Sequence, residues 1–270
     1  MIDLSALRSA LYLPASNARA IAKARTLAAD LVILDLEDAV PDEAKHDALH
    51  AAIAAAEEGG FPGLVSIRIN ASGTPWHRHE VAAIAASGAV DLVVVPKVES
   101  ANGIAALAAK LERPLLAMIE TPAGVFNAAA IAAGQGVAGL IAGTNDLAAT
   151  LRLPPGAPRA SLSMALQAIV LAARASGGIA LDGVWNRLDD PEGFEAECRE
   201  GRLLGFDGKA LIHPSQVEPC IRCFSPDAAE VEEAEALIAA ATGGAERFRG
   251  RMVETLHVEA AKRLLARAIR

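Results

Sequence analysis

A chain of 270 residues is long enough for one large domain or two small ones, and its hydrophobic content of 53% excludes a disordered polypeptide. The formal net charge of −8 argues against a nucleic-acid-binding protein, although a local cation can still hold a small anionic substrate. The amino terminus lacks the basic and apolar regions of a signal peptide, and three cysteines do not suit a secreted disulfide framework, so we expect a cytoplasmic protein.

Eight short apolar runs recur along the first 220 residues, and helical segments separate them. After the first run, for example, Asn17 can cap a helix whose Ile21 and Ala24 share one face. The uncharged segment over residues 121–145 contains Pro122 and several glycines, so we do not expect it to span a membrane. The eight runs are Leu7–Leu13, Leu31–Leu36, Leu64–Ile69, Asp91–Val95, Leu115–Ile119, Leu140–Ala142, Ile179–Val184 and Ala210–Ile212.

Eight strands alternating with helices predict a (β/α)8 TIM barrel, an α/β fold, over residues 1–220. A doubly wound sheet is the main alternative, but no Gly-x-Gly-x-x-Gly turn follows the first strand. Residues 221–270 contain more helix than a closed barrel needs. The last helix, from His257 to the end, carries an apolar stripe that includes Val258 and Leu264 and that must be covered. We therefore predict a C-terminal helical extension packed on the barrel or on a neighbouring subunit.

Polar residues gather directly after the apolar runs, where barrel strands end and the active site of this fold lies. Glu120 follows the fifth run and Asp146 follows the sixth, so both carboxylates are predicted at the same end of the barrel. Two carboxylates without a nearby histidine suit a hard cation, and Mg²⁺ fits better than Zn²⁺. The whole strand-end set is Asp35, Glu37, Asp38, Arg68, Asn70, Lys97, Glu99, Glu120, Asn145, Asp146, Asp182 and His213.

Seven stretches, spread in order over nearly the whole chain, resemble the citrate lyase β subunit-like branch of the HpcH/HpaI aldolase/citrate lyase family. The resemblance implies a Mg²⁺-dependent barrel that cleaves or forms carbon–carbon bonds next to CoA-type thioesters, usually as a trimer or a multiple of one. The stretches are Arg8–Pro14, Ile33–Val40, Ile67–Asn70, Pro96–Glu99, Ile119–Pro122, Gly143–Leu147 and Gly205–Gln216.

The resemblance also implies roles for individual residues at the strand ends. By position, Glu120 and Asp146 match the metal ligands, and Arg68 matches the arginine that faces the carbonyl and carboxylate oxygens of the substrate. Lys97 either assists at the same site or forms a salt bridge with Glu37 or Glu99.

Two further expectations come from the residue types themselves. Asp35 and Glu37 are expected to hold water around the metal. If residues 143–146 open a helix, the backbone N–H groups around Gly143, Thr144 and Asn145 can bind a substrate carboxylate.

The expected reaction is cleavage of a β-hydroxyacyl thioester, of the citryl-, malyl- or citramalyl-CoA type, to an acyl thioester and a 2-oxo acid. Mg²⁺ is the expected cofactor, and CoA is part of the substrate. Hydrolysis of a malyl-CoA-type thioester, or an aldolase reaction on a 2-oxo acid, is the alternative on the same scaffold. A barrel that binds CoA or a 2-oxo acid without turnover, as a subunit of a lyase complex, is the alternative outside enzymes.

One motif departs from the family pattern near the carboxyl terminus. The family's Gly-x-Met-Ile/Val-Asp element is present as residues 250–254 and ends in Glu254, which is one methylene longer than aspartate. Some relatives use that aspartate as an acid or base donated by a neighbouring subunit. We therefore predict a homo-oligomer, most simply a trimer, in which Glu254 lies near the mouth of an adjacent barrel. The alternative is that Glu254 caps a helix or lies at the rim.

Overall fold

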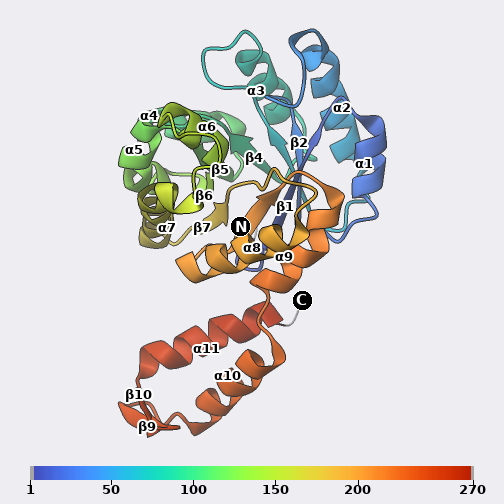
Figure 1. The fold of residues 1–270 in the computed structure, drawn as a ribbon. Helices are drawn as coiled ribbons and strands as arrows, with labels where there is room; N and C mark the ends of the chain where they lie inside the picture. The colour runs from blue at the N-terminus through green and yellow to red at the C-terminus, as the bar shows by residue number, and fades with distance from the viewer. Residues whose placement is uncertain (1–2, 269–270) are drawn as a thin grey trace.

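The computed structural model describes residues 3–268, and eight parallel strands form a closed barrel in chain order (Figure 1). Strand β1 pairs with β2 on one side and with β8 on the other, which closes the sheet. This confirms the predicted (β/α)8 architecture. The barrel strands are β1 (Ser9–Pro14), β2 (Leu31–Asp35), β3 (Leu64–Arg68), β4 (Leu92–Val95), β5 (Leu115–Ile119), β6 (Val137–Ala142), β7 (Ile179–Asp182) and β8 (Gly208–Leu211).

Helices connect the strands on the outside of the barrel, and local capping residues explain where several of them begin. Thr121 accepts a hydrogen bond from the backbone N–H of Gly124, and Pro122 occupies the first position of α5, where proline is tolerated. The helices are α1 (Ala18–Ala24), η1 (Asp42–Ala44), α2 (Lys45–Glu58), α3 (His77–Ala86), α4 (Ala101–Leu111), α5 (Pro122–Ala132), α6 (Thr144–Thr150), η2 (Arg159–Leu162), α7 (Ser163–Ser176), α8 (Pro191–Leu204), η3 (Pro214–Gln216), α9 (Val217–Phe224), α10 (Ala228–Ala240) and α11 (Thr255–Ala268).

The apolar core has two layers because successive side chains of a strand point to opposite faces. In β2, Ile33 lies in the cluster inside the barrel, whereas its neighbours Val32 and Leu34 lie in the cluster between the strands and the helices. Side chains therefore fill the interior of the barrel, and the open space lies beyond the carboxyl ends of the strands. Among the described residues, none of the helices has both the length and the apolar character needed to cross a bilayer.

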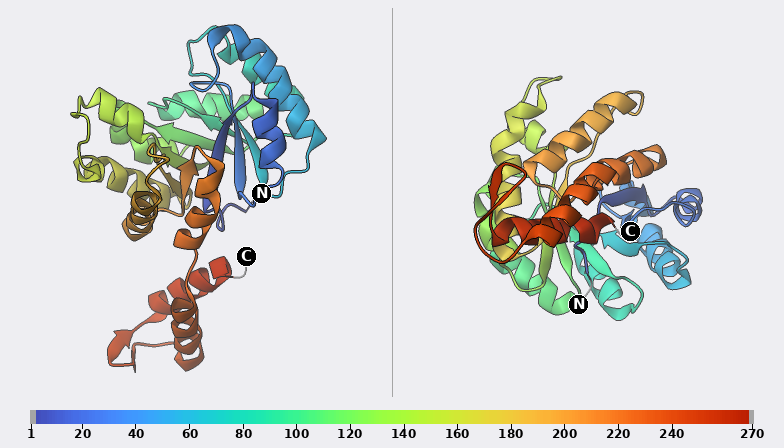
Figure 2. Two further views of the ribbon diagram at one scale, coloured as in Figure 1. Left: turned by 45° about the vertical axis from the view of Figure 1, so that its right-hand side comes forward. Right: turned by 90° about the horizontal axis from the view of Figure 1, so that it is seen from below.

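The residues after α9 form an arm made of α10, the two-stranded β9–β10 ribbon (Glu246–Phe248 and Arg251–Val253) and α11. Figure 1 and the left view of Figure 2 show this arm projecting away from the barrel. It has a small core of its own, in which Leu237 of α10, Val253 of β10 and Ala261 of α11 are buried. Much of the apolar stripe of the last helix is thus covered by α10 of the same chain, with Leu264 and Leu265 partly buried there.

The arm contacts the barrel at the end opposite the carboxyl ends of the strands. Arg267 of α11 donates hydrogen bonds to the backbone oxygens of Ser5, which precedes β1, and of Asp207, which precedes β8. Helix α9 continues to Phe224 and contacts both β1 and β8, so the predicted barrel boundary at residue 220 falls inside a barrel helix. The projecting part of the chain begins after α9.

Candidate functional site: a carboxylate-rich pocket at the strand ends

A pocket of about 370 Å³ lies at the carboxyl ends of the strands, which is where a barrel is expected to hold its active site. Of the strand-end and site residues predicted from the sequence, those that line this pocket are Asp35, Asp38, Arg68, Glu120, Gly143, Thr144, Asn145 and Asp146. Glu37 and Lys97 lie behind this surface and contact its residues. Glu254 does not line the pocket, because it is exposed in the arm between β10 and α11.

Glu120 directly follows β5 and is only 3% exposed. Its Oε1 accepts a hydrogen bond of 2.6 Å from the backbone N–H of Lys97. Burial raises the pKa of Glu120 to about 7, with the charges of Glu37 and Asp146 acting in the same direction, although the Lys97 N–H opposes the shift. Within residues 3–268, no cationic side chain lies within salt-bridge distance of Glu120. A buried carboxylate of this kind is costly unless a cation compensates it.

Asp146 is positioned by the first turn of α6, which begins directly after β6. The chain can pass from β6 into α6 here because position 143 is glycine. A Cβ atom at Gly143 would lie 2.2 Å from the Cβ of Glu120 and 2.7 Å from its Oε2, and no real side chain tolerates such contacts. The missing side chain therefore allows Glu120 and the start of α6 to share one side of the pocket.

Arg68 ends β3 and uses two of its nitrogens on a neighbouring carboxylate. Its Nε and Nη2 each donate a 2.6 Å hydrogen bond to Asp35, which ends β2. Burial alone would lower the pKa of Arg68, but the hydrogen bonds and the charge of Asp35 outweigh it and raise that pKa. The guanidinium also lies over the Tyr12 ring, with its Cζ 5.0 Å from the ring centroid. Its Nη1 lies 3.0 Å from Oε2 of Glu37, 3.5 Å from Oδ2 of Asp38 and 3.8 Å from the sulfur of Met118.

Glu37 and Lys97 form the part of the site behind the pocket surface. The Nζ of Lys97 lies 2.7 Å from Oε1 of Glu37 and 3.8 Å from Oδ2 of Asp146, so Glu37 is the closer of two salt-bridge partners. Oε2 of Glu37 lies 3.0 Å from Nη1 of Arg68 but accepts no well-aligned hydrogen bond. Burial raises the pKa of Glu37, against the opposing effect of Arg68. Lys97 itself has a φ of 51°, a left-handed conformation that is uncommon outside glycine and that recurs at functional sites.

Negative charge exceeds positive charge in this group of side chains, which we call the inner cluster. Five carboxylates surround two cationic side chains, and every candidate ligand atom of the carboxylates is an oxygen. Oxygen ligands and surplus negative charge fit a hard cation such as Mg²⁺. The inner cluster comprises Asp35, Glu37, Asp38, Arg68, Lys97, Glu120 and Asp146.

Several pocket residues were not predicted from the sequence. Tyr12, the only tyrosine of the chain, lines the pocket from β1, and its hydroxyl lies 3.5 Å from the sulfur of Met118. Asn186, in the segment after β7, donates a 2.7 Å hydrogen bond to Asn145. The single tyrosine near the end of a strand was an available signal, whereas Asn186 lies in a loop whose path the sequence does not reveal.

Comparison with known proteins identifies a matching family and similar proteins. The model of the family described as HpcH/HpaI aldolase/citrate lyase matches residues 8–214. A (3S)-malyl-CoA thioesterase from Cereibacter sphaeroides is 44% identical, over 97% of this chain and 94% of that protein.

Solved structures agree with the family match. A Mycobacterium tuberculosis CitE structure, described as a complex with magnesium, acetoacetate and coenzyme A, superposes with a TM-score of 0.85 at 34% identity. This alignment covers 98% of this chain and 99% of that one. A citrate lyase β subunit from the same organism, complexed with oxaloacetate and magnesium, gives a TM-score of 0.74 at 35% identity, over 83% of this chain and all of that one.

Proposed function

The chain belongs to the HpcH/HpaI aldolase/citrate lyase family, and on this premise we propose that it is a Mg²⁺-dependent carbon–carbon lyase. Its substrate would be a β-hydroxyacyl thioester of CoA, of the malyl, citramalyl or citryl type, and its products an acyl thioester and a 2-oxo acid. The observation that carries the proposal is the surplus of carboxylates around Glu120 with Arg68 beside it in one pocket. Solved relatives described with magnesium together with oxaloacetate or pyruvate support the 2-oxo acid as a product.

In this proposal Glu120 and Asp146 hold the metal ion. Glu120 fits this role because it is buried without a cationic side chain of its own, and Asp146 fits because it faces the same pocket from α6. When bound, Mg²⁺ supplies a Lewis acid that polarises the carbonyl and carboxylate oxygens of a 2-oxo acid. Glu37 would then hold water at the edge of the site, and Lys97 would keep Glu37 in position. Asp35 was expected to hold water as well, but its two oxygens already accept hydrogen bonds from Arg68 and from the backbone N–H groups of residues 37 and 39, so it would position Arg68 instead.

The cleavage step removes a proton from the substrate hydroxyl and breaks the adjacent carbon–carbon bond. The bonding electrons pass to the thioester as an enolate, which then takes a proton at carbon, while the former hydroxyl carbon becomes the keto group of the 2-oxo acid. The guanidinium of Arg68, which lines the pocket, would stabilise the oxygen on which negative charge develops. The N–H groups at the start of α6, where Gly143 provides no side-chain cap, would bind the carboxylate of the substrate.

We further propose that Glu254 serves the pocket of a different copy of the chain. Glu254 cannot reach the pocket of its own chain, because the arm that carries it contacts the barrel at the end opposite the pocket. The arm also leaves Met252 and Leu256, on either side of Glu254, 71% and 60% exposed. An exposed apolar pair of this kind suits contact with another subunit. A homo-oligomer, most simply a trimer, would place Glu254 at the mouth of an adjacent barrel.

Mixing two inactive variants tests the shared site. Glu120→Gln damages the pocket, whereas Glu254→Gln damages the arm, and each variant alone is expected to be inactive. If sites are shared, unfolding and refolding the two together restores part of the activity, because some mixed oligomers contain one intact pocket beside one intact arm. A monomeric wild type in sedimentation, or a chain truncated after Gly250 that stays fully active, would contradict this assignment.

Thioester hydrolysis is the second candidate, because the relatives that are 42–44% identical over nearly the whole chain are described as (3S)-malyl-CoA thioesterases. Hydrolysis would add water to the thioester carbonyl and release the CoA thiol with the free hydroxy acid. The same substrate and the same cation would serve both reactions. They differ in whether water or the β-hydroxyl group is activated.

One assay separates the reactions. The purified protein is incubated with Mg²⁺ and a panel of malyl-, citramalyl- and citryl-CoA, and free thiol and 2-oxo acid are measured separately. The proposal expects 2-oxo acid without free thiol. Free thiol without 2-oxo acid would show a thioesterase, and neither product would favour a barrel that only binds CoA or a 2-oxo acid.

A further inference from the structure

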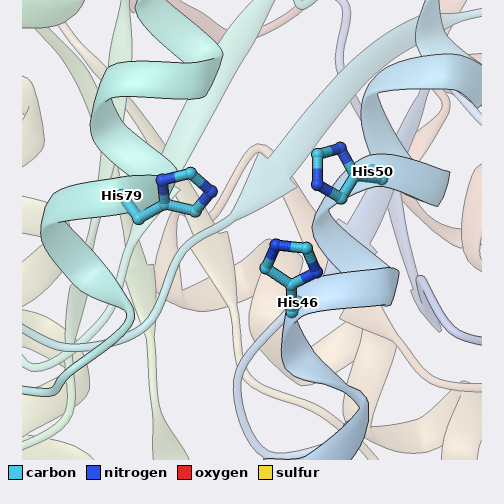
Figure 3. Close-up of side chains that lie close together, drawn as sticks. All are labelled: His46, His50 and His79. Carbon is cyan, nitrogen blue, oxygen red and sulfur yellow. The ribbon is translucent and has the colours of Figure 1, made fainter.

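Three exposed histidines gather on the outer surface between α2 and α3 and form no part of the pocket described above (Figure 3). His46 and His50 are four residues apart on α2, so their rings project from the same helix face. His79 reaches toward them from the first turn of α3. The ring of His46 stands edge-on to that of His50 at 4.7 Å and is stacked with that of His79 at 5.9 Å between centroids. One potential ligand atom from each ring lies within 4.8 Å of the other two.

The backbone at α2 is held in place next to the first of these histidines. Lys45, which precedes His46, is buried, and its Nζ donates 2.8 Å hydrogen bonds to the backbone oxygens of Leu36 and Glu37. The ammonium also lies 4.9 Å from the centre of the Trp76 ring at the start of α3. This contact joins the beginnings of the two helices.

The backbone at α3 is held in the same way next to His79. Glu80 is buried and accepts hydrogen bonds of 2.7 and 2.5 Å from the backbone N–H and the side chain of Asn70, which follows β3. Asn70 in turn donates to the backbone oxygen of Leu36, the same residue that Lys45 holds. Both helix starts are therefore fixed to the ends of β2 and β3, and only the exposed imidazoles have to rotate for their nitrogens to converge.

The geometry points to a metal site, and we propose that His46, His50 and His79 bind a late first-row divalent ion such as Zn²⁺. Zn–N bonds of about 2.0–2.1 Å in a tetrahedron separate the ligand nitrogens by about 3.3 Å, so each nitrogen moves by about an ångström or less. Imidazole selects Zn²⁺, Cu²⁺ and Ni²⁺, whereas Mg²⁺ prefers oxygen. Three protein ligands leave the remaining coordination position to water or to an exogenous ligand.

A carboxylate lies next to one of the three rings. Nδ1 of His46 is 3.5 Å from Oδ1 of Asp47. Carboxylates beside metal-binding imidazoles commonly fix the tautomer, so that the other ring nitrogen offers its lone pair to the ion. The bound ion would cross-link α2 and α3. It would be chemically distinct from the Mg²⁺ ion proposed for the inner cluster. The proposal does not rest on the proposed function.

Zinc titration of the tag-free, full-length protein tests the site. Calorimetry is carried out at neutral pH with Mg²⁺ in excess, which keeps oxygen-rich sites occupied. We expect the wild type to bind Zn²⁺ and His79→Gln to bind it at least about tenfold more weakly, because one of three ligands is lost. The matched control is His257→Gln, which changes an exposed histidine of the arm and should leave zinc affinity unchanged.

Thermal unfolding provides a second readout. Binding to the folded state alone raises the melting temperature by mass action, so Zn²⁺ should stabilise the wild type and the His257→Gln variant but not His79→Gln. All three side chains are exposed, so we expect the fold to remain intact when they are substituted. Equal zinc affinity in the wild type and in a variant without all three histidines would overturn the proposal. An unchanged affinity in His79→Gln alone would also overturn it, because the site would then not bridge the two helices.

Discussion

Two groups of charged side chains in this barrel differ in their balance of charge. The inner cluster around Glu120 and Arg68 has five carboxylates and two cationic side chains. A second group, the outer cluster, has three carboxylates and two cationic side chains between the strands and α8. Its members are Arg159, Asp182, Glu197, Glu200 and Lys209. The Nζ of Lys209 lies 2.9 Å from Asp182 and 2.7 Å from Glu197, and Arg159 donates a 2.8 Å hydrogen bond to Asp182.

The difference in balance appears in the protonation of the carboxylates. Burial opposes ionisation of Asp182, but Lys209 and Arg159 outweigh burial and lower its pKa. At Glu120, the backbone N–H and the charge of Lys97 do not outweigh the effect of burial, and the pKa rises to about 7. The outer cluster balances its buried Asp182 with cations of its own and holds the barrel to η2 and α8, whereas none of the ion pairs that the described residues form in the inner cluster includes Glu120. Charge balance, rather than burial, thus distinguishes the structural network from the candidate active site.

The largest effect is expected from Glu120→Gln in the inner cluster. The change removes an anionic ligand from a site with few protein ligands, so Mg²⁺ binding and turnover should be lost. The variant should remain folded and, without Mg²⁺, be at least as stable as the wild type, because a neutral amide does not carry the cost of a buried charge. Calorimetry with Mg²⁺, steady-state assays and circular dichroism measure these properties. Wild-type affinity for Mg²⁺ in this variant or in Asp146→Asn would contradict the assignment of the metal ligands.

Lys209→Met should have the opposite consequence in the outer cluster. It leaves Asp182 buried beside a weakened set of cations, and breaking a buried pair in this way costs about 3–5 kcal/mol of unfolding free energy. Urea denaturation measures the loss. The double variant Asp182→Asn/Lys209→Met is the control and should recover much of the stability, because both charges are then absent. Equal stability of wild type and Lys209→Met would mean that the outer cluster does not hold the barrel together.

A smaller effect is expected for Arg68→Lys, which keeps the charge of the inner cluster but changes its geometry. The two-nitrogen edge of Arg68 binds Asp35, and an ammonium cannot make that paired contact while also reaching the pocket. We expect kcat/KM to fall about 10²–10³-fold, nearly as far as in Arg68→Ala. Steady-state kinetics of both variants test this expectation. A lysine variant with wild-type kcat/KM would reduce Arg68 to a general positive charge.

The smallest effect concerns the pH dependence of stability without Mg²⁺. Glu120 keeps its proton in the folded protein up to about pH 7 but loses it near 4.5 when unfolded, so its contribution to stability declines as the pH rises through this range. Asp182 has a lowered pKa, so its contribution is present above the pKa of the unfolded chain and is lost as the pH falls through the folded pKa. As the pH rises, the contribution of Glu120 to stability therefore falls, whereas that of Asp182 increases.

Unfolding free energies measured across pH with a chelator present separate these contributions. Glu120→Gln should flatten the decline toward neutral pH by about 1–3 kcal/mol, with Glu37, whose pKa is also raised, accounting for part of the remaining slope. Asp182→Asn should instead flatten the decline on the acid side. The same pH profile in Glu120→Gln and wild type would show that Glu120 is not held protonated by burial.

Local pattern was enough to predict most of the scaffold. All eight predicted strands are present, and the strand-end position of Glu120 and Asp146 leads both into one pocket. Asp182 shows the limit of this reasoning, because it also ends a strand but points away from the pocket toward α8. A Cβ atom at Gly201 of α8 would lie 2.7 Å from Oδ2 of Asp182. Lys209, inside an apolar strand, was not predicted at all, although it decides the charge balance of the outer cluster.

The sequence by itself determined the period of apolar residues and the polar residues that follow each run, because both depend on neighbours along the chain. The tertiary structure alone decided which charges meet. Arg68 binds Asp35 rather than presenting its whole edge to the pocket, and the arm carries Glu254 away from its own barrel. His79 comes within reach of the histidines of α2 in the same way. Electrostatic and ligand interactions depend on the distance between side chains in space. For side chains far apart in the sequence, that distance is fixed only when the barrel closes.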